Sequence, residues 1–273
     1  MKNRLLQLLS DNRSTLRYFR AEATTADEAT IWLYDVIVDD DYWGGVGALT
    51  FAQTLAAITA PTIHLRVNSP GGDVFAGRAI ETAIREHPSR VIGHIDGLAA
   101  SAASFVVLGA DEIEISDGAF VMIHKGWTYT WGNADELRKT ASLLDQVDAS
   151  LVRTYAAETG ETEADIAAWM ADETWFDAAA AIEKGFADRL AGTAGSSAAA
   201  RASTWNLAAF SNVPEMQDAL RAAAAVARAS SVPASSSPTA PALPPAPAAS
   251  TTAVLPVPDF AAMKRRLNLA QQL

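Results

Sequence analysis

The stretch "HIDGLAASAASFVVLGA", residues 94–110, places a serine among alanines, and the fold and function of the chain depend on what that serine does. Ser101 follows an apolar segment and precedes what looks like the start of a buried helix of small residues. Such a serine either fills space or acts as a nucleophile at the N-terminal end of a helix, where free N–H groups and a partial positive charge are available. A serine nucleophile also needs a base and an oxyanion site, which other segments must supply.

The composition indicates one sizeable globular domain with additional segments. The chain has 273 residues, of which 49% are hydrophobic and 19% charged, and it has no cysteine. No apolar run is long enough to span a bilayer, and the N-terminus lacks the pattern of a signal peptide. We therefore expect a cytoplasmic protein with no membrane partner, no metal and no cofactor. The net charge of −11 argues against a nucleic-acid partner, which would require a basic surface.

The hydrophobic pattern alternates between strands and helices. Apolar and β-branched runs predict strands at 31–38, 62–67, 90–95, 112–116 and 119–124, whereas helical spacing predicts helices at 74–87, 133–159, 162–171 and 178–184. This alternation indicates βαβ units and a largely parallel sheet, so the fold class is α/β.

Three polar segments follow predicted strands and should meet at the carboxyl edge of the sheet, where such folds place their sites. They are residues 68–73, residues 96–101 and His124. Gly71 and Gly72 can direct N–H groups into a cavity, although a plain β-turn is the better interpretation of this motif alone. His124 follows the rigid apolar run "FVMI", and it is either a catalytic base or a structural residue.

Taken together, these motifs resemble the ClpP peptidase family of serine proteases, and within it the ClpP-related head maturation (prohead) proteases of tailed phages. The stretches that carry the resemblance are "VNSPGGDVFAGRAI", "GLAASAASFVVLGA", "FVMIHKGW" and "ETWFDAAAAIEKGFAD". The resemblance covers roughly residues 30–190. It implies the spiral of ββα units shared by ClpP and crotonase folds, with a protruding long helix and a disordered tail.

The resemblance also implies a catalytic site. Ser101 would be the nucleophile and His124 the general base, while the N–H groups of Gly72 and Ala102 would form the oxyanion hole. The predicted reaction is acyl transfer through an acyl-enzyme.

The acidic member of the triad is the main departure from the family pattern. It falls on Glu173, where cellular ClpP enzymes have Asp, and the neighbouring Asp172 is the alternative. Glutamate can still orient an imidazole, although its side chain is one methylene longer.

An extended peptide substrate is expected to bind beside Gly71 and beside three residues that follow His124, namely Lys125, Gly126 and Trp127. A Ser–Lys dyad that uses Lys125 is a weaker alternative, because strand alternation directs Lys125 away from the face that His124 uses.

For the biological role, the resemblance implies an ATP-independent endopeptidase that cleaves capsid or scaffold proteins during phage head maturation. It also implies a homo-oligomeric ring through the helix at 133–159. The alternatives are a host-type ClpP subunit that works with an ATP-dependent unfoldase, a crotonase-type acyl-CoA enzyme, and a non-catalytic scaffold-associated protein of the same fold.

The segment organisation follows from the same patterns. We predict an N-terminal extension over 1–30, a peptidase domain over 31–190 and a Pro/Ala/Ser-rich, partly helical linker over 191–258. Residues 259–273 return to helical periodicity as a short basic amphipathic helix, which is either a docking peptide or a frayed helix without a partner.

Overall fold

The computed structural model describes residues 3–15, 17–192 and 205–214. The chain divides into two units, Met1–Arg228 and Ala229–Leu273, and every described residue belongs to the first. The predicted disordered tail and the basic helix at 259–273 lie outside the described residues, as does most of the predicted linker, of which only residues 191–192 and 205–214 are described.

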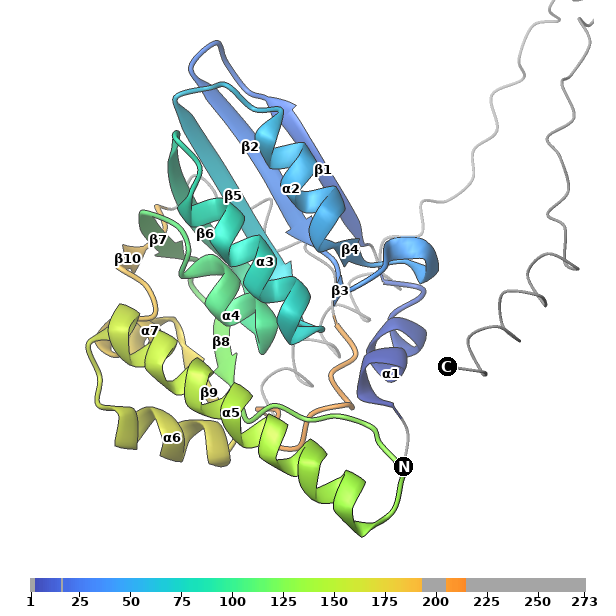
Figure 1. The fold of residues 1–273 in the computed structure, drawn as a ribbon. Helices are drawn as coiled ribbons and strands as arrows, with labels where there is room; N and C mark the ends of the chain where they lie inside the picture. Colours follow the sequence, from blue (N-terminus) through green and yellow to red (C-terminus); the bar gives the residue numbers. More distant parts are fainter. Residues whose placement is uncertain (1–2, 16, 193–204, 215–273) are drawn as a thin grey trace, which may run out of the picture. The chain divides into compact units, whose positions relative to one another are not determined.

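A parallel sheet forms the centre of the fold (Figure 1). Its parallel strands are β2 (Glu28–Tyr34), β5 (Thr62–Ser69), β6 (Arg90–Ala100), β7 (Glu112–Ile115) and β10 (Arg189–Leu190), in that order. The prediction of a largely parallel sheet is therefore confirmed. At one edge, β1 (Tyr18–Ala23) pairs antiparallel with β2. A short separate sheet joins β3 (Ile37–Val38) to β4 (Val46–Gly47).

The end of β6 belongs to a second pairing that positions the site. Beyond the residues that pair with β7, β6 pairs with the parallel strand β8 (Phe120–Ile123), with Ala100 opposite Met122. Strand β9 (Thr174–Asp177) then pairs antiparallel with β8. The residues that follow β6 and β8 are consequently neighbours at the same edge.

Helices cover one face of the sheet (Figure 1). The covering helices are α2 (Ala48–Ala56), α3 (Val74–Arg85) and α4 (Ala102–Val107). Helix α5 (Ala134–Thr159) is the long protruding one, and α6 (Glu163–Ala171) and α7 (Ala178–Glu183) follow it. Near the N-terminus lie α1 (Arg4–Asp11) and a 3₁₀ turn (Asp41–Trp43). The described part of the chain has no helix that is both long and apolar enough to cross a membrane.

Local sequence explains where the main helices begin and end. The Asp73 carboxylate accepts hydrogen bonds from the N–H groups of Phe75 and Ala76 and so caps α3. Helix α5 begins with a capping box between Asn133 and Glu136 and ends at Gly160, which adopts the left-handed conformation. The predicted bounds of these helices differ from the observed ones by at most two residues.

The strand predictions were less accurate. The predicted strand 31–38 is interrupted at Asp35, so that β2 and β3 are separate. Strand β6 continues to Ala100 rather than ending at residue 95, because Ala99 pairs with both Ser69 and Val121. Asp96 therefore lies inside a strand, where it accepts a hydrogen bond from Arg66 Nε at 2.8 Å, and it does not belong to the strand-end group.

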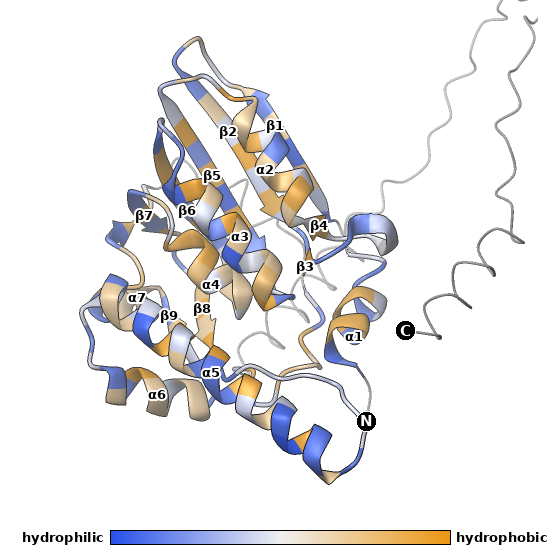
Figure 2. Ribbon diagram, in the orientation of Figure 1, coloured by the Kyte–Doolittle hydropathy of each residue, from blue (hydrophilic) through white to orange (hydrophobic). Residues whose placement is uncertain are grey.

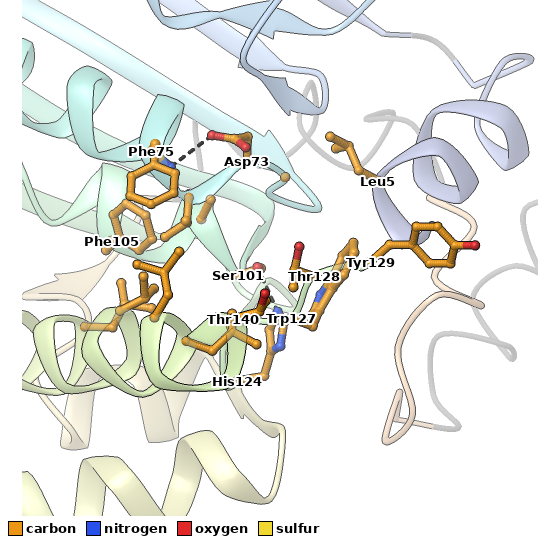
Figure 3. A pocket seen from close by; sticks show the side chains of 18 of the residues that line it. Leu5, Asp73, Phe75, Ser101, Phe105, His124, Trp127, Thr128, Tyr129 and Thr140 are labelled. Atoms are coloured by element: carbon orange, nitrogen blue, oxygen red, sulfur yellow. Dashed lines mark hydrogen bonds between the residues drawn. The ribbon is translucent and has the colours of Figure 1, made fainter. Parts of the chain in front are cut away.

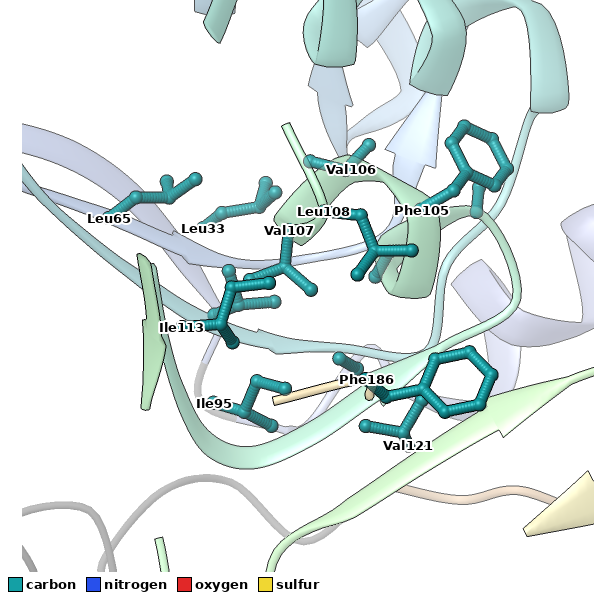
Figure 4. Close-up of a cluster of buried hydrophobic side chains, with 14 of the residues drawn as sticks. Leu33, Leu65, Ile95, Phe105, Val106, Val107, Leu108, Ile113, Val121 and Phe186 are labelled. Carbon is teal, nitrogen blue, oxygen red and sulfur yellow. The ribbon is translucent and has the colours of Figure 1, made fainter. Parts of the chain in front are cut away.

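Two apolar clusters lie on opposite faces of β6 and β8, as strand alternation requires. The main core lies between the sheet and the helices and contains Phe105, Val121 and Phe186 (Figure 4). The second cluster packs Leu98, Ala100, Phe120 and Met122 against apolar residues of α1 and of segment 205–210. In Figure 2, α1 is orange over most of its length and blue near its N-terminus.

Candidate active site

Ser101 connects β6 to α4 in a strained conformation. Its φ is 53° and its ψ is −124°, a region that residues with a Cβ rarely adopt. The Ser101 N–H donates to the carbonyl of Met122 at 2.8 Å, which fixes this turn to β8. Backbone strain of this kind persists only where the surrounding structure enforces it, and it is concentrated at functional sites.

The imidazole of His124 reaches Ser101 across the β6–β8 pairing (Figure 3). The distance between His124 Nε2 and Ser101 Oγ is 2.8 Å. Burial lowers the pKa of His124 to about 4, although the nearby Glu173 carboxylate opposes this shift. The ring is therefore neutral at pH 7 and free to accept a proton from Ser101.

The glycine turn after β5 packs directly against Ser101. Gly71 has a φ of 82°, and a Cβ on it would overlap the carbonyl oxygen of Ala100. A Cβ on Gly72, where φ is 150°, would overlap the carbonyl oxygen of Ile37. Only glycine fits at either position, so the backbone of this turn approaches the serine more closely than other residues would permit.

Two backbone N–H groups beside Ser101 are available to a ligand. Within the described residues, the N–H groups of Gly72 and Ala102 form no hydrogen bond with the protein. Both residues line the same cavity as Ser101 and His124, which has a volume of about 280 Å³. The structure thus brings together the four residues whose roles the sequence resemblance implied.

The far part of this cavity is apolar. It is lined by Phe105 of α4 and by side chains from one face of α5, namely Leu143, Leu144, Val147, Leu151 and Tyr155. The Tyr155 hydroxyl lies 2.6 Å from Ser104 Oγ, so its polar atom is already paired. This part of the cavity suits an apolar side chain.

The two candidate acids differ in burial and in contacts. Glu173 is buried and adopts a φ of 50°, and its Oε1 accepts hydrogen bonds from the N–H groups of Ser211 at 2.7 Å and Asn212 at 2.6 Å. Asp172 is exposed, and its carbonyl accepts a hydrogen bond from the Asn212 side chain. Among the described residues, neither carboxylate forms a hydrogen bond with His124. Glu173 nevertheless acts on that ring through its charge, which raises the pKa of His124 against the effect of burial.

The three residues after His124 lie in different surroundings. Gly126 and Trp127 line the Ser101 cavity, whereas exposed Lys125 lines cavities on other sides of the ring and of α5. The Gly126 N–H donates to Asp148 Oδ1 of α5 at 2.7 Å, so it is already engaged. The Trp127 ring contacts the Arg4 guanidinium at 5.4 Å.

Sequence reasoning missed several residues near the site. Asp148 and Phe105 carry no local signal, since their roles depend on tertiary contacts. Phe210, Ser211 and Asn212 fall in a segment that composition predicts to be a linker. Elsewhere, the described residues contain no cluster of His, Asp and Glu side chains with the geometry of a metal site.

Comparisons with known proteins identify the family and the fold. The Clp protease family matches residues 15–194. The chain is 32% identical over 150 residues to ATP-dependent Clp protease proteolytic subunit 2 of Treponema denticola, and the aligned region covers 54% of this chain and 73% of the relative. It is 28% identical over 130 residues to ATP-dependent Clp protease proteolytic subunit 1 of Leifsonia xyli subsp. xyli, and the aligned region covers 47% of this chain and 66% of that relative. The chain thus spans about two thirds of the length of these relatives.

A solved structure shows the same fold. A ClpP1 mutant from Listeria monocytogenes aligns with a TM-score of 0.52 and 22% identity, and the alignment covers 61% of this chain and 93% of that one. The predicted ClpP-like α/β fold is therefore confirmed. Because the family matches more than half of the sequence, the chain belongs to the Clp protease family of serine peptidases.

Proposed function

We propose that the chain is an endopeptidase in which Ser101 is the nucleophile and His124 the general base. His124 Nε2 takes the Ser101 hydroxyl proton while Oγ attacks a peptide carbonyl carbon. The same imidazole then protonates the leaving amine, and the C–N bond breaks. Water, activated by His124, finally attacks the acyl-enzyme and releases the acid. The observation that carries this proposal is the 2.8 Å distance between Ser101 Oγ and His124 Nε2 in an open cavity.

The oxyanion of the tetrahedral intermediate would be held by the N–H groups of Gly72 and Ala102. Both residues line the Ser101 cavity, and neither N–H has a protein acceptor among the described residues. Preorganised donors of this kind typically contribute a factor of ~10² to 10³ in rate.

Glu173 is our proposed third member of the site. Its charge is the one carboxylate influence that raises the pKa of His124, so it stabilises the imidazolium that forms during catalysis. Asp172, the alternative, is exposed at the end of α6 and less suited to this role.

The substrate is proposed to be a polypeptide with an apolar side chain next to the cleaved bond. The support is the apolar lining of the cavity beyond Ser101, contributed by α4 and α5. An extended peptide would lie between the Gly71–Gly72 turn and the Gly126–Trp127 segment. Because the Gly126 N–H is bound to Asp148, the glycine turn would supply the main backbone contacts.

This proposal is tested with fluorogenic peptides that differ only in the residue before the cleaved bond. We expect hydrolysis of peptides with Leu or Phe there and at least tenfold slower hydrolysis with Asp or Lys. Ser101→Ala and His124→Gln should each abolish the activity. Hydrolysis that survives in Ser101→Ala would contradict the assigned nucleophile, and equal rates on charged and apolar peptides would contradict the assigned pocket.

For the biological role, we propose ATP-independent cleavage of capsid or scaffold proteins during phage head maturation, in the bacterial host cytoplasm or inside the procapsid. The support is the resemblance to prohead proteases and the long Pro/Ala/Ser-rich region after residue 190. Proteins of the Clp protease family form homo-oligomeric rings. We propose that this chain does so through α5, whose N-terminal half is largely exposed.

A host-type proteolytic subunit is the second candidate, because the relatives are named as subunits of ATP-dependent Clp proteases. The two roles are separated by casein degradation with and without an ATP-driven unfoldase, and by coexpression with phage capsid and scaffold proteins. Cleavage of a capsid or scaffold protein without ATP supports head maturation. Degradation of casein only in the presence of the unfoldase and ATP supports the host-type role.

A further inference from the structure

Residues 205–214, which we call the strap, pack behind the candidate site (orange in Figure 1). Trp205 and Leu207 are almost fully buried, with 3% and 1% of their surfaces exposed. Together with Ala209 and Phe210 they cover the face of β6 and β8 that lies opposite the helices. The strap thus contacts the two strands whose next residues are Ser101 and His124.

Specific hydrogen bonds fix the start of the strap. The carboxamide of Asn12, which has no exposed surface, donates to the Asn206 carbonyl at 3.0 Å and accepts from the Asn206 N–H at 2.6 Å. The Trp205 indole N–H donates to Asn68 Oδ1 at 3.2 Å, at the end of β5. These contacts define the path of the strap before it reaches the site.

The end of the strap contacts two of the proposed catalytic groups directly. The Phe210 ring packs edge-on against the His124 imidazole, with centroids 5.7 Å apart and planes at 70°. The next two N–H groups, of Ser211 and Asn212, both donate to Glu173 Oε1. The Asn212 side chain also donates to the Asp172 carbonyl at 2.6 Å, which fixes the backbone just before Glu173.

Glu173 depends on these two donors. Its carboxylate is buried, and among the described residues the strap provides the only hydrogen bonds to it. A buried carboxylate without donors is strongly disfavoured, so loss of the strap amides would displace Glu173 from its buried position. Glu173 also has a positive φ, which is unfavourable for a residue with a Cβ. Contacts with the surrounding residues must therefore hold its backbone in this conformation.

From these contacts we infer that the strap is a positioning element of the catalytic site: the amides of Ser211 and Asn212 hold the Glu173 carboxylate, and the Phe210 ring holds the His124 imidazole. This inference rests on the proposed function of Ser101 and His124. The strap lies beyond residues 15–194, so it is outside the region matched by the Clp protease family.

Other charged groups also face His124. Arg4 of α1 and Lys125 line the cavity behind the ring together with Asp172 and Glu173. Arg4 lowers the pKa of His124, whereas Glu173 raises it. The strap therefore holds a buried anion whose charge raises the pKa of His124.

The test compares three full-length variants. Asn212→Pro removes one N–H donor to Glu173, whereas Asn212→Ala keeps that N–H and removes only the side chain. Val213→Pro places a proline one residue further on, where no hydrogen bond of the described structure is lost. We expect Asn212→Pro to lower kcat about tenfold with KM unchanged, Asn212→Ala to lower it less because only the bond to the Asp172 carbonyl is lost, and Val213→Pro to stay close to wild type. In a Glu173→Gln background, Asn212→Pro should cause no further loss.

A spectroscopic measurement separates positioning from activity. Two-bond ¹H–¹⁵N spectra of ¹⁵N-histidine-labelled protein report the tautomer of each imidazole at neutral pH, and His124→Gln identifies the His124 signals. We expect one tautomer, protonated at Nδ1, in wild type and a mixture in Asn212→Pro. If Asn212→Pro does not fold, Phe210→Ala takes its place in the test. Phe210→Ala should lower kcat and shift the His124 signals, and Phe210→Leu should restore both.

The outcomes are distinguishable. Unchanged kcat and unchanged His124 signals in Asn212→Pro overturn the role of the strap, as does an equal loss in Val213→Pro. If wild-type protein hydrolyses no peptide, the proposed function fails, and the strap is then judged by the spectra alone. Shifted His124 signals in Asn212→Pro would still support positioning, and identical signals would overturn it.

Discussion

Backbone strain in this molecule is concentrated at the site. Among the described residues, Ser101 and Glu173 are the only non-glycine residues with positive φ. One lies on each side of His124 in the proposed arrangement. Strain costs of this kind are of order 1–3 kcal/mol each, so the surrounding packing must enforce both conformations. The coincidence of the two strained residues with the two ends of the proposed triad favours a catalytic rather than a space-filling Ser101.

The glycine turn gives a first prediction. Gly72→Ala should destabilise the protein by at least ~2 kcal/mol more than Gly118→Ala, because a Cβ on Gly72 overlaps the Ile37 carbonyl, whereas a Cβ on Gly118 meets no atom within 4 Å. Both glycines have positive φ, 150° at Gly72 and 80° at Gly118, so each substitution also carries a conformational cost. Urea unfolding of the two variants measures the difference, and equal stabilities would contradict the described turn.

A second prediction concerns pH and His94. Burial, with the nearby Arg66 cation, lowers the pKa of His94 from 6.5 to about 4, and the burial of the ring outweighs the Glu114 carboxylate that lies 3.0 Å from Nδ1. The unfolded chain therefore takes up a proton below pH 6.5 that the folded protein does not, so stability is full above pH 6.5 and falls towards pH 4. The shift corresponds to no more than about 3 kcal/mol.

The measurement is the free energy of unfolding from pH 7.5 to 4 for wild type and His94→Gln. The variant should lose less stability over this range, because it has no group to protonate there. His124 contributes a slope of the same sign, since its pKa is also lowered to about 4, so a residual slope is expected in the variant. Identical pH profiles for the two proteins would show that His94 is not the buried neutral group described.

At the scale of elements, α5 both lines the Ser101 cavity and presents an exposed surface. Its C-terminal half is packed through Leu151, Val152 and Tyr155, whereas its N-terminal half is largely exposed. Leu137 there is 43% exposed, and Leu143, at the rim of the Ser101 cavity, is 52% exposed. Apolar side chains on an otherwise exposed helix are consistent with a contact between subunits.

The corresponding prediction is that Leu137→Asp disrupts self-association. Sedimentation velocity should show a shift from the proposed ring to smaller species, while the far-UV circular dichroism stays unchanged. Ser142→Asp adds the same charge at another exposed position of α5 and is expected to leave more of the ring intact. An unchanged sedimentation profile for Leu137→Asp would place the interface elsewhere.

Elements with clear periodicity or capping were predictable from the sequence. The helices α3 and α5 show apolar spacing and recognisable ends at Asp73, Asn133 and Gly160. The end of β6 was not predictable, because Leu98, Ala99 and Ala100 form a run of small apolar residues with no period. Only the pairing with Ser69 and Val121 makes that run a strand.

The candidate site was predictable only in part. Ser101 and His124 follow strands, and the family resemblance joined them, but no local signal chose between Asp172 and Glu173. The contacts of Glu173 with the strap join residues 38 and 39 positions apart. The strap follows a low-complexity stretch in the sequence, and its burial results from tertiary packing against β6, β8 and α1.

At the scale of the whole molecule, the described unit has two apolar layers on β6 and β8. The first, under the helices, is the core that fits the family fold. The second joins α1 and the strap, and both lie outside residues 15–194. Segments from both ends of the described chain therefore meet on the face of β6 and β8 opposite the helices. Leu5 of α1 also lines the Ser101 cavity.

The central claim is that the Ser101 hydroxyl is activated by His124, and covalent labelling tests it most directly. Full-length protein is treated with a fluorophosphonate, and the adduct is located by mass spectrometry of the digested chain. We predict a single adduct on Ser101 in wild type, none in Ser101→Ala and strongly reduced labelling in His124→Gln. An unlabelled wild type, or an adduct elsewhere that survives in Ser101→Ala, would contradict the account.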